Sequence, residues 1–252
     1  MSFDVGADAY GRFMGRFSEP LATDFVALLD GRPGQRIIDV GCGPGALTAE
    51  LVRLYGATAV SAVDPSEPFV AAARARFPDV DVRQVAAEQL PYDDETFDIA
   101  AAQLVVPFMT DPVAGLTEMA RVTRRGGLIA ASAWDHAGAG GPLSLFWRAV
   151  RDLDPEARDE STLAGAREGH LAELFGQAGL HDVESGLLTV HVDCATFDEW
   201  WQPFTFGVGP AGEHVAGLDE EGRDELRSRC ATLLPPAPFR VSASAWYALG
   251  RT

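Results

Sequence analysis

Apolar residues recur in two alternating kinds of pattern through the first half of the chain. Short apolar runs typical of buried strands lie at RIIDV (36–40), ATAVSAVD (57–64), DVDVRQV (79–85), FDIAAAQLV (97–105) and GGLIAASAWD (126–135). Between them, helical spacing of apolar residues predicts helices at ALTAELVRLYG (46–56), SEPFVAAARARF (66–77) and DPVAGLTEMARVT (111–123). This alternation indicates βαβ units, so we expect a doubly wound α/β fold, a mostly parallel sheet with helices on both faces.

The pattern is less regular outside this segment. The first 17 residues read as an irregular arm, and Ser18 reads as the cap of a helix SEPLATDFVALLD that Gly31 ends. Further on we expect helices at 142–153 and 168–179, strands at 183–193 and 239–251, and one helix near the end of a long connection between Cys194 and Pro238. No repeat or linker interrupts the chain, so we expect one domain.

Composition narrows the choice of ligand. The net charge is −17 and the pI is near 4.6, which argues against nucleic acid, because polyanion binding depends on Lys and Arg. No apolar run approaches the roughly 20 residues that span a bilayer. The N-terminus, MSFDVGADAYGRF, lacks the pattern of a secretory signal, so the expected location is the cytoplasm. We therefore expect a small-molecule ligand, with no nucleic acid and no membrane partner.

Two absent residue types exclude whole classes of chemistry. All 20 basic residues are Arg, and the chain contains neither Lys nor Asn. A Walker lysine and a pyridoxal Schiff base are therefore both excluded for this chain. The three cysteines lie far apart and have no metal-ligand spacing, so we expect no metal site.

The stretch IIDVGCGPGALTAEL joins a predicted strand to a predicted helix through three glycines. Glycines in the first βα turn let a ligand approach the backbone at the carboxyl end of the strand. The stretch fits the dinucleotide pattern G-x-G-x-x-G/A through Gly41, Gly43 and Ala46. It fits equally the pattern D-x-G-x-G-x-G through Asp39, Gly41, Gly43 and Gly45. The glycines alone leave both ligands open.

Asp39 separates the two possibilities. Asp64, at the end of the second predicted strand, could bind ribose hydroxyls in either case. A carboxylate at Asp39 would repel a pyrophosphate in a partly buried cleft, whereas it would attract a ligand that carries ammonium and sulfonium groups. Asp39 therefore favours a ligand with these cationic groups over NAD or NADP.

At this point the sequence resembles the class I S-adenosylmethionine (SAM)-dependent methyltransferases, and most closely their type 11 branch of ubiquinone/menaquinone-biosynthesis-like enzymes. DVGCGPG at 39–45 is similar to motif I of that family. The other similar segments are AYGRFMGRFSEPLA (9–22), VDPSEPF (63–69), AAEQLPYDDETFD (86–98), AQLVVPFMTDP (102–112) and RVTRRGGLIAAS (121–132). The resemblance thus runs from about Tyr10 to Trp134, and no motif covers the remainder.

The resemblance implies a Rossmann-like, seven-stranded sheet whose last strand, near Phe239–Gly250, is antiparallel. It implies a single methyltransferase domain over residues 1–252 that binds SAM as its cofactor. Within it we expect an N-terminal arm and helix (1–31), a SAM-binding core (36–135), and insertions at 136–165 and 193–238 that cover the substrate site.

The resemblance also implies which residues bind SAM. Asp39 would lie near the amino group of the methionine part, Asp64 would bind both ribose hydroxyls, and Glu88 would lie along the adenine. Ala86 departs from the family, which usually has an acid there. The implied cofactor residues are Tyr10, Arg16, Asp39, Gly41, Cys42, Gly43, Gly45, Asp64, Pro65, Ala87, Glu88, Gln103 and Leu104.

Less can be inferred about the methyl acceptor. His136, just after the fifth predicted strand, is a candidate catalytic base, or else a solvated loop histidine. Trp200 and Trp201 are candidates for the wall of a pocket for a partly apolar or aromatic acceptor, or for a satellite core. We therefore expect methyl transfer to a small molecule, with the accepting atom (O, N or C) and the oligomeric state open. The alternatives are a nucleotide-dependent oxidoreductase and a non-catalytic SAM-binding protein.

Overall fold

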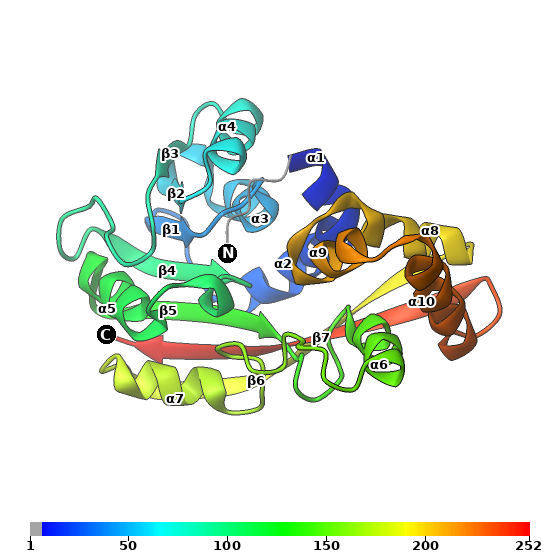
Figure 1. Ribbon diagram of the computed structural model, residues 1–252. Coiled ribbons are helices and arrows are strands. Elements are labelled where there is room, and N and C mark those ends of the chain that lie inside the picture. Colours follow the sequence, from blue (N-terminus) through cyan, green and yellow to red (C-terminus); the bar gives the residue numbers. More distant parts are fainter. Residues whose placement is uncertain (1–6) are drawn as a thin grey trace.

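A computed structural model describes residues 7–252, and one sheet of seven strands runs through its centre (Figure 1). The strands are β1 (Ile37–Val40), β2 (Val60–Asp64), β3 (Asp81–Gln84), β4 (Phe97–Gln103), β5 (Thr123–Trp134), β6 (His181–Cys194) and β7 (Phe239–Arg251). Their order across the sheet is β3-β2-β1-β4-β5-β7-β6. β1 to β5 are parallel to one another, whereas β7 is antiparallel to β5 and β6. The predicted fold class and its antiparallel last strand are confirmed.

Helices and single helical turns connect the strands. The α-helices are α1 (Ala7–Tyr10), α2 (Arg16–Ala27), α3 (Ala46–Tyr55), α4 (Glu67–Arg76), α5 (Pro112–Val122), α6 (Ser144–Leu153), α7 (His170–Gln177), α8 (Phe197–Trp201), α9 (Gly209–Gly217) and α10 (Glu220–Leu233). η1 (Gly11–Gly15) is a short π-helix, and the short 3-10 helices are η2 (Ala57–Ala59), η3 (Val106–Phe108) and η4 (Gln202–Phe206). No helix in the described part of the chain combines the length and the apolar character needed to cross a bilayer.

β1, β2 and β4 are buried along almost their whole length because helices cover both faces of the sheet there, whereas the edge strand β3 is mostly exposed. Ile38 packs in a cluster with α5 and α7, whereas its neighbour Ile37 packs in a second cluster with α2 and α3. Successive side chains of a strand point to opposite faces, so a strand between two helical layers buries both sets. The alternating chain therefore brings the carboxyl ends of β1, β2, β4 and β5 to one edge of the sheet.

A third apolar cluster lies beyond that edge, around α6 and α8 to α10 (Figure 1). The expectation of one helix between Cys194 and Pro238 is wrong, because α8, η4, α9 and α10 all lie there. α9 has the sequence GPAGEHVAG, whose glycines hide its helical pattern. A Cβ atom at Gly212 would lie 2.6 Å from the backbone of Gly207, so close packing at this turn depends on glycine.

The N-terminal arm is more helical than its sequence indicates. α1, η1 and α2 follow one another without a break, and Ser18 lies inside α2 instead of capping it. Phe13 and Phe17 are both buried in the third cluster. Burial of these two rings fixes the arm, which outweighs the preference of Ser18 for a helix end.

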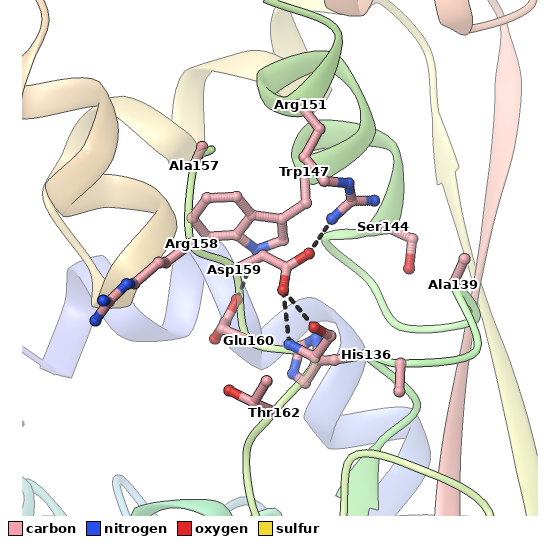
Figure 2. A pocket seen from close by; sticks show the side chains of 12 residues that line it. His136, Ala139, Ser144, Trp147, Arg151, Ala157, Arg158, Asp159, Glu160 and Thr162 are labelled. Carbon is pink, nitrogen blue, oxygen red and sulfur yellow. Dashed lines mark hydrogen bonds and ion pairs between the residues drawn. The ribbon is translucent and has the colours of Figure 1, made fainter. Parts of the chain in front are cut away.

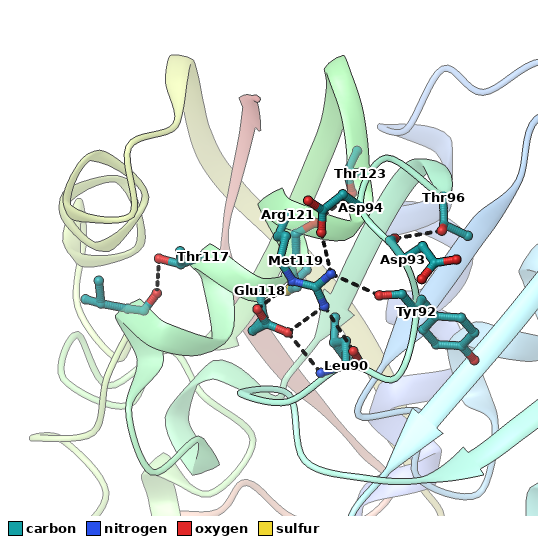
Figure 3. A network of polar contacts seen from close by, with 11 residues as sticks. Leu90, Tyr92, Asp93, Asp94, Thr96, Thr117, Glu118, Met119, Arg121 and Thr123 are labelled. Carbon is teal, nitrogen blue, oxygen red and sulfur yellow. Dashed lines mark hydrogen bonds and ion pairs between the residues drawn. The ribbon is translucent and has the colours of Figure 1, made fainter.

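Arg121, near the end of α5, fastens the connection between β3 and β4 (Figure 3). Its guanidinium donates to the carbonyl oxygens of Leu90 and Tyr92 at 3.0 and 2.9 Å, and it forms ion pairs with Glu118 and Asp94. A planar fork with five donors is suited to such a set of acceptors. This connection includes Ala87 and Glu88, so the network also fixes a segment predicted to bind the cofactor.

Candidate functional site

The glycine loop between β1 and α3 has the backbone conformation that its three glycines allow. Gly41, Gly43 and Gly45 have φ angles of +75°, +53° and +95°, which residues with a side chain rarely adopt. A Cβ atom at Gly41 would lie 2.4 Å from the side chain of Val105, whereas one at Gly43 would meet nothing within 4 Å. Gly41 is therefore required by packing, and Gly43 leaves its space open.

A narrow pocket of about 30 Å³ lies against this loop, and we call it the glycine-loop pocket. It brings together residues from the arm, β1, the loop and the end of β4. Seven of the thirteen predicted cofactor residues, Tyr10, Asp39, Gly41, Cys42, Gly43, Gln103 and Leu104, line it together with Ser18, Pro44, Ala46 and Leu47.

Asp39 is a buried carboxylate in the wall of this pocket. Its side chain is 1% exposed and accepts a hydrogen bond of 2.6 Å from the Thr48 hydroxyl. Burial raises the pKa of Asp39 to about 7, and the nearby charge of Asp64 adds to that effect. The carboxylate has no ion-pair partner among residues 7–252. A cation bound in the pocket would stabilise its charged form.

Asp64, at the end of β2, holds the glycine loop from the other side. Its two carboxylate oxygens accept hydrogen bonds from the backbone amides of Gly43 and Ser66, both at 2.8 Å. The residue is buried, and this desolvation raises its pKa. Each carboxylate oxygen can accept more than one hydrogen bond, so Asp64 retains capacity for ligand hydroxyls.

The remaining residues predicted along the adenosine lie near this edge of the sheet but outside the pocket lining. Ala87 is buried, and Pro65 is exposed. Glu88 accepts hydrogen bonds from the backbone amides of Thr110 and Asp111 at 2.8 and 3.2 Å, which ties it to the start of α5.

Four buried polar atoms near the ends of β4 and β5 have no hydrogen-bond partner among residues 7–252: Ser18 Oγ, Gln103 Oε1, Ser132 Oγ and Trp134 Nε1. Gln103 Nε2 donates to the Ser18 carbonyl at 2.9 Å, and Gln103 lies opposite Ser132 in the sheet. Buried polar atoms are almost always paired in native proteins. Two of the four residues, Ser18 and Gln103, line the glycine-loop pocket, which indicates a polar ligand there.

The two predicted residues of the arm differ in position. The Tyr10 ring lies 5.2 Å from that of Phe69, and burial and the charge of Asp64 raise its pKa to about 12. Arg16, by contrast, donates to the Glu199 carbonyl at 3.1 Å and to Cys194 Sγ at 3.1 Å. The structure thus directs Arg16 toward the second insertion and places Tyr10 at the pocket.

A second and larger pocket, of about 640 Å³, lies between the end of β5, α6 and the segment after α6 (Figure 2). We call it the His136 pocket. Its lining is mostly polar and consists of His136, Ala137, Ala139, Ser144, Trp147, Arg151, Ala157, Arg158, Asp159, Glu160, Ser161 and Thr162. Burial lowers the pKa of His136 to about 4, so the imidazole is neutral near pH 7.

Sequence reasoning missed Glu160 in this pocket. Glu160 is 5% exposed, and its Oε2 accepts a hydrogen bond of 2.8 Å from Trp147 Nε1. Burial raises the pKa of Glu160 to about 7. It lies in the segment PEARDEST, which carries no motif and has the charge pattern of a solvated loop. Only the fold shows that one of these acids is enclosed.

Trp200 and Trp201 lie behind the His136 pocket and line neither pocket. They are 3% and 6% exposed and belong to the third apolar cluster. The Trp200 ring packs 4.8 Å from that of Phe204, which stacks on Phe146 at 4.5 Å. Phe146 in turn meets the edge of Trp147, a pocket residue, at 5.1 Å. The tryptophans thus contact the pocket wall only through other rings.

Among residues 7–252, no group of three or more His, Cys, Asp or Glu side chains could hold a metal ion. The three cysteines are free and buried.

Comparison with known proteins bears on this geometry. Residues 38–131 match the family described as a methyltransferase domain. A ubiquinone biosynthesis O-methyltransferase of Rhizobium rhizogenes is 38% identical over 117 residues, which cover 45% of this chain and 46% of the relative. A demethylmenaquinone methyltransferase of Chlorobaculum tepidum is 33% identical over 99 residues, 39% of this chain and 40% of the relative. The matches therefore span less than half the length of these curated relatives.

The likeness to solved structures extends over nearly the whole chain. A SAM-dependent methyltransferase of Thermotoga maritima, described as a possible histamine N-methyltransferase, has a TM-score of 0.58 and 20% identity. The alignment covers 97% of this chain and 96% of that one. At this identity the similarity establishes the fold, including that of the second half.

Proposed function

Because residues 38–131 form a methyltransferase domain of the class I, type 11 kind, we propose that the whole chain is a SAM-dependent methyltransferase of a small molecule. The observation that carries the proposal is the glycine-loop pocket, in which the buried acid Asp39 lies beside a loop of positive-φ glycines that a second buried acid, Asp64, holds through the Gly43 amide.

The residues of this pocket fit SAM in charge and in hydrogen bonding. Asp39 is buried without a cationic partner among the described residues, and an ammonium group would supply one. The unpaired oxygens of Ser18 and Gln103 fit a polar ligand, and the open space at Gly43 lets a ligand approach the backbone. A dinucleotide fits less well, because its pyrophosphate would meet the charge of Asp39.

In this proposal the cofactor is bound by residues of the glycine-loop pocket and by others beside it. Asp39 binds the ammonium of the methionine part, and Asp64 binds the ribose hydroxyls while it holds Gly43 in place. Ala87 and Glu88 border the adenine. The remaining proposed cofactor residues are Tyr10, Arg16, Gly41, Cys42, Gly45, Pro65, Gln103 and Leu104.

Methyl transfer from SAM requires few chemical groups from the protein. SAM, when bound, supplies a methyl group that is already activated by the sulfonium. The residues of the chain then act by orientation: they hold the cofactor at the carboxyl edge and position the acceptor beside it. The arm, with Tyr10 in the pocket lining, excludes water. Neutral His136 is the proposed base for an acceptor that must lose a proton.

We propose that the acceptor is partly apolar or aromatic and that the insertions 136–165 and 193–238 cover it. The wall of the His136 pocket and the aromatic rings behind it support this assignment. Trp200 and Trp201 then shape the acceptor site from the second layer.

Isothermal titration calorimetry with SAM, S-adenosylhomocysteine, NAD and NADP tests the proposal. We expect binding of the first two ligands and no heat from the dinucleotides. Binding of NADP without SAM would instead indicate a nucleotide-dependent oxidoreductase. Binding of SAM without turnover of any acceptor would indicate a SAM-binding protein.

A further inference from the structure

We propose that the His136 pocket is the acceptor site and that Glu160 in it binds a protonated amine of the acceptor. This inference rests on the proposed function only in naming the bound molecule the methyl acceptor. The pocket itself is defined by residues of the chain.

The pocket lies where an acceptor would have to bind. His136 follows the end of β5 by two residues, and Leu104 of the glycine-loop pocket donates from its backbone amide to the Ser132 carbonyl at 2.9 Å. His136 lies four positions after Ser132, and a chain advances at most about 3.6 Å per residue. The two pockets therefore lie on neighbouring strands within about 14 Å of backbone, a span that one small molecule and the methionine part of SAM can bridge.

Glu160 is held in a fixed orientation with one oxygen unused. The indole of Trp147 donates to Oε2, as Figure 2 shows, while Oε1 has no hydrogen bond to any described residue. Oε1 is not fully enclosed by protein atoms, so it remains accessible from the pocket. A carboxylate oxygen that is both fixed and accessible is suited to accept a hydrogen bond from a ligand.

The surrounding charges leave Glu160 without a counter-ion. The neighbouring carboxylate of Asp159 is ion-paired with Arg151 and accepts two hydrogen bonds from Ser161. Arg158 lines the pocket but forms no ion pair with Glu160, and in Figure 2 its side chain extends away from it. His136, the other titratable group of the lining, is neutral near pH 7. Glu160, when ionised, therefore has no direct ion-pair partner among the described residues.

An ammonium group resolves this imbalance, and a hydroxyl does not. A buried carboxylate is costly unless it is paired with a cation, and the raised pKa of Glu160, about 7, reflects that cost. A protonated amine supplies both the charge and the donor that Oε1 lacks, in a charge-assisted hydrogen bond. The Trp147 ring and three alanines of the lining leave room beside it for an apolar skeleton.

The test measures binding to the protein without cofactor, by calorimetry, with primary amines and alcohols of the same skeleton. Phenethylamine with 2-phenylethanol and tyramine with tyrosol form the first pairs, followed by aliphatic pairs. We expect the preferred amines to bind about tenfold or more tightly than their alcohols, as loss of a charge-assisted hydrogen bond implies. Equal binding within every pair, or no binding by any amine, would overturn the proposal.

Variants of Glu160 assign the effect to this carboxylate. Glu160→Gln keeps an oxygen for the Trp147 indole and should remove the preference for amines, while Glu160→Asp should restore part of it. Glu156→Gln, which removes an exposed charge from the same segment, should leave the preference intact. An unchanged preference in Glu160→Gln, with its melting temperature preserved, would show that Glu160 does not bind the amine.

The dependence on pH separates two modes of binding. An ammonium needs ionised Glu160, so the affinity for amines should rise between pH 6 and pH 8, through the pKa of about 7. A neutral ligand bound by protonated Glu160 would instead weaken over this range. SAM titrated into Glu160→Gln should bind as to the wild type. Absence of SAM binding to the wild type would contradict the proposed function and leave the amine measurements unaffected.

Discussion

At the residue scale, Asp39 is a buried carboxyl group whose ionised form is unfavourable in the fold without ligand. Its carboxylate is buried beside a second acid, Asp64, and receives a single side-chain hydrogen bond, from Thr48. Strain and unfavourable charge often concentrate at binding sites, where a ligand relieves them. In our proposal the ligand's ammonium group has this effect.

The first prediction concerns the stability of the protein without cofactor as a function of pH. The pKa of Asp39 rises from 3.8 to about 7 on folding, so between these values the folded state binds more protons than the unfolded state. The free energy of unfolding should therefore fall as pH rises through this window. Glu160 acts in the same sense, with a pKa of about 7. His136, whose pKa is lowered to about 4, opposes them up to about pH 6.5.

Asp39→Asn should flatten this profile. At pH 8 the variant without cofactor should be more stable than the wild type by more than about 1 kcal/mol, since one pKa unit corresponds to about 1.4 kcal/mol. The amide oxygen can still accept from Thr48. Thermal unfolding from pH 4 to pH 8 measures the effect. A variant that is less stable at pH 8 would show that the charge of Asp39 is compensated in the wild type.

The second prediction concerns Asp64. Asp64→Ala should weaken SAM binding by roughly 2–3 kcal/mol, because hydrogen bonds of the carboxylate to the ligand are lost. The loss of its bonds to Gly43 and Ser66 should also loosen the loop. Calorimetry gives the affinity for SAM. The affinity of Asp64→Asn, which keeps one acceptor oxygen, should lie between those of the wild type and Asp64→Ala. Unchanged affinity with a lowered melting temperature would make Asp64 a structural residue.

The sequence allows some of these residues to be predicted as site residues and not others. Asp39 and Asp64 could be predicted as candidate cofactor residues because each has a fixed place relative to the glycines and the predicted strands. Glu160 could not, since burial of one acid in PEARDEST depends on how α6 and the segment after it fold back toward β5. Local charge patterns carry no information on such enclosure.

At the element scale, the glycine loop offers a matched pair of substitutions, which gives the third prediction. An alanine that replaces Gly41 or Gly43 must adopt an unfavourable positive φ, which lowers the free energy of unfolding by about 1 kcal/mol. Gly41→Ala in addition places Cβ 2.4 Å from Val105 and should lower the melting temperature much more. Gly43→Ala should remain folded but lose SAM affinity. Equal melting temperatures for the two variants would contradict the packing role of Gly41.

The fourth prediction concerns the series of rings from Trp200 to Trp147. Trp200→Ala should lower the free energy of unfolding by about 3–5 kcal/mol, as truncation of a buried aromatic residue does. Trp200→Phe, which preserves contact with Phe204, should cost much less. Chemical denaturation measures both. An Ala variant as stable as the wild type would show that the indole is not part of the core.

Elements with a strong periodic pattern could be predicted, and those stabilised mainly by packing could not. β1, β4 and α5 agree with their predicted ranges to within a few residues. α9 was missed because a glycine-rich segment has low helix propensity, and its helix depends on close contact between Gly212 and Gly207. The arm was missed for a similar reason, since Phe13 and Phe17 are fixed by distant residues.

At the scale of the whole molecule, the arm and the second insertion form one unit over the glycine-loop pocket. Phe13 packs edge-on against Phe204 at 5.1 Å, Arg12 lies over the Phe206 ring at 4.6 Å, and Arg16 bonds to the Glu199 carbonyl. The glycine-loop pocket has a volume of about 30 Å³, far less than that of the His136 pocket. Tyr10 of the arm and Ser18 of α2 line it, so we expect these residues to move when a ligand the size of SAM enters.

The fifth prediction follows from that geometry. Hydrogen–deuterium exchange of backbone amides at residues 10–17 should be measurable without cofactor and should slow when SAM binds. Amides of α7, which packs on the far part of the sheet, serve as the control and should not change. Exchange in the arm that SAM leaves unaltered would mean that the cofactor enters without displacing it.

The hydrogen bond between Trp147 and Glu160 has a spectroscopic consequence. The emission of an indole responds to the electric field around it, and here a titratable carboxylate lies 2.8 Å from its ring nitrogen. The chain has five tryptophans, and Trp134, Trp200 and Trp201 are enclosed among apolar side chains. The difference between the emission spectra of the wild type and of Trp147→Phe would isolate the signal of Trp147. Occupation of the His136 pocket would then shift the fluorescence of the unlabelled protein, a direct optical readout for screening ligands.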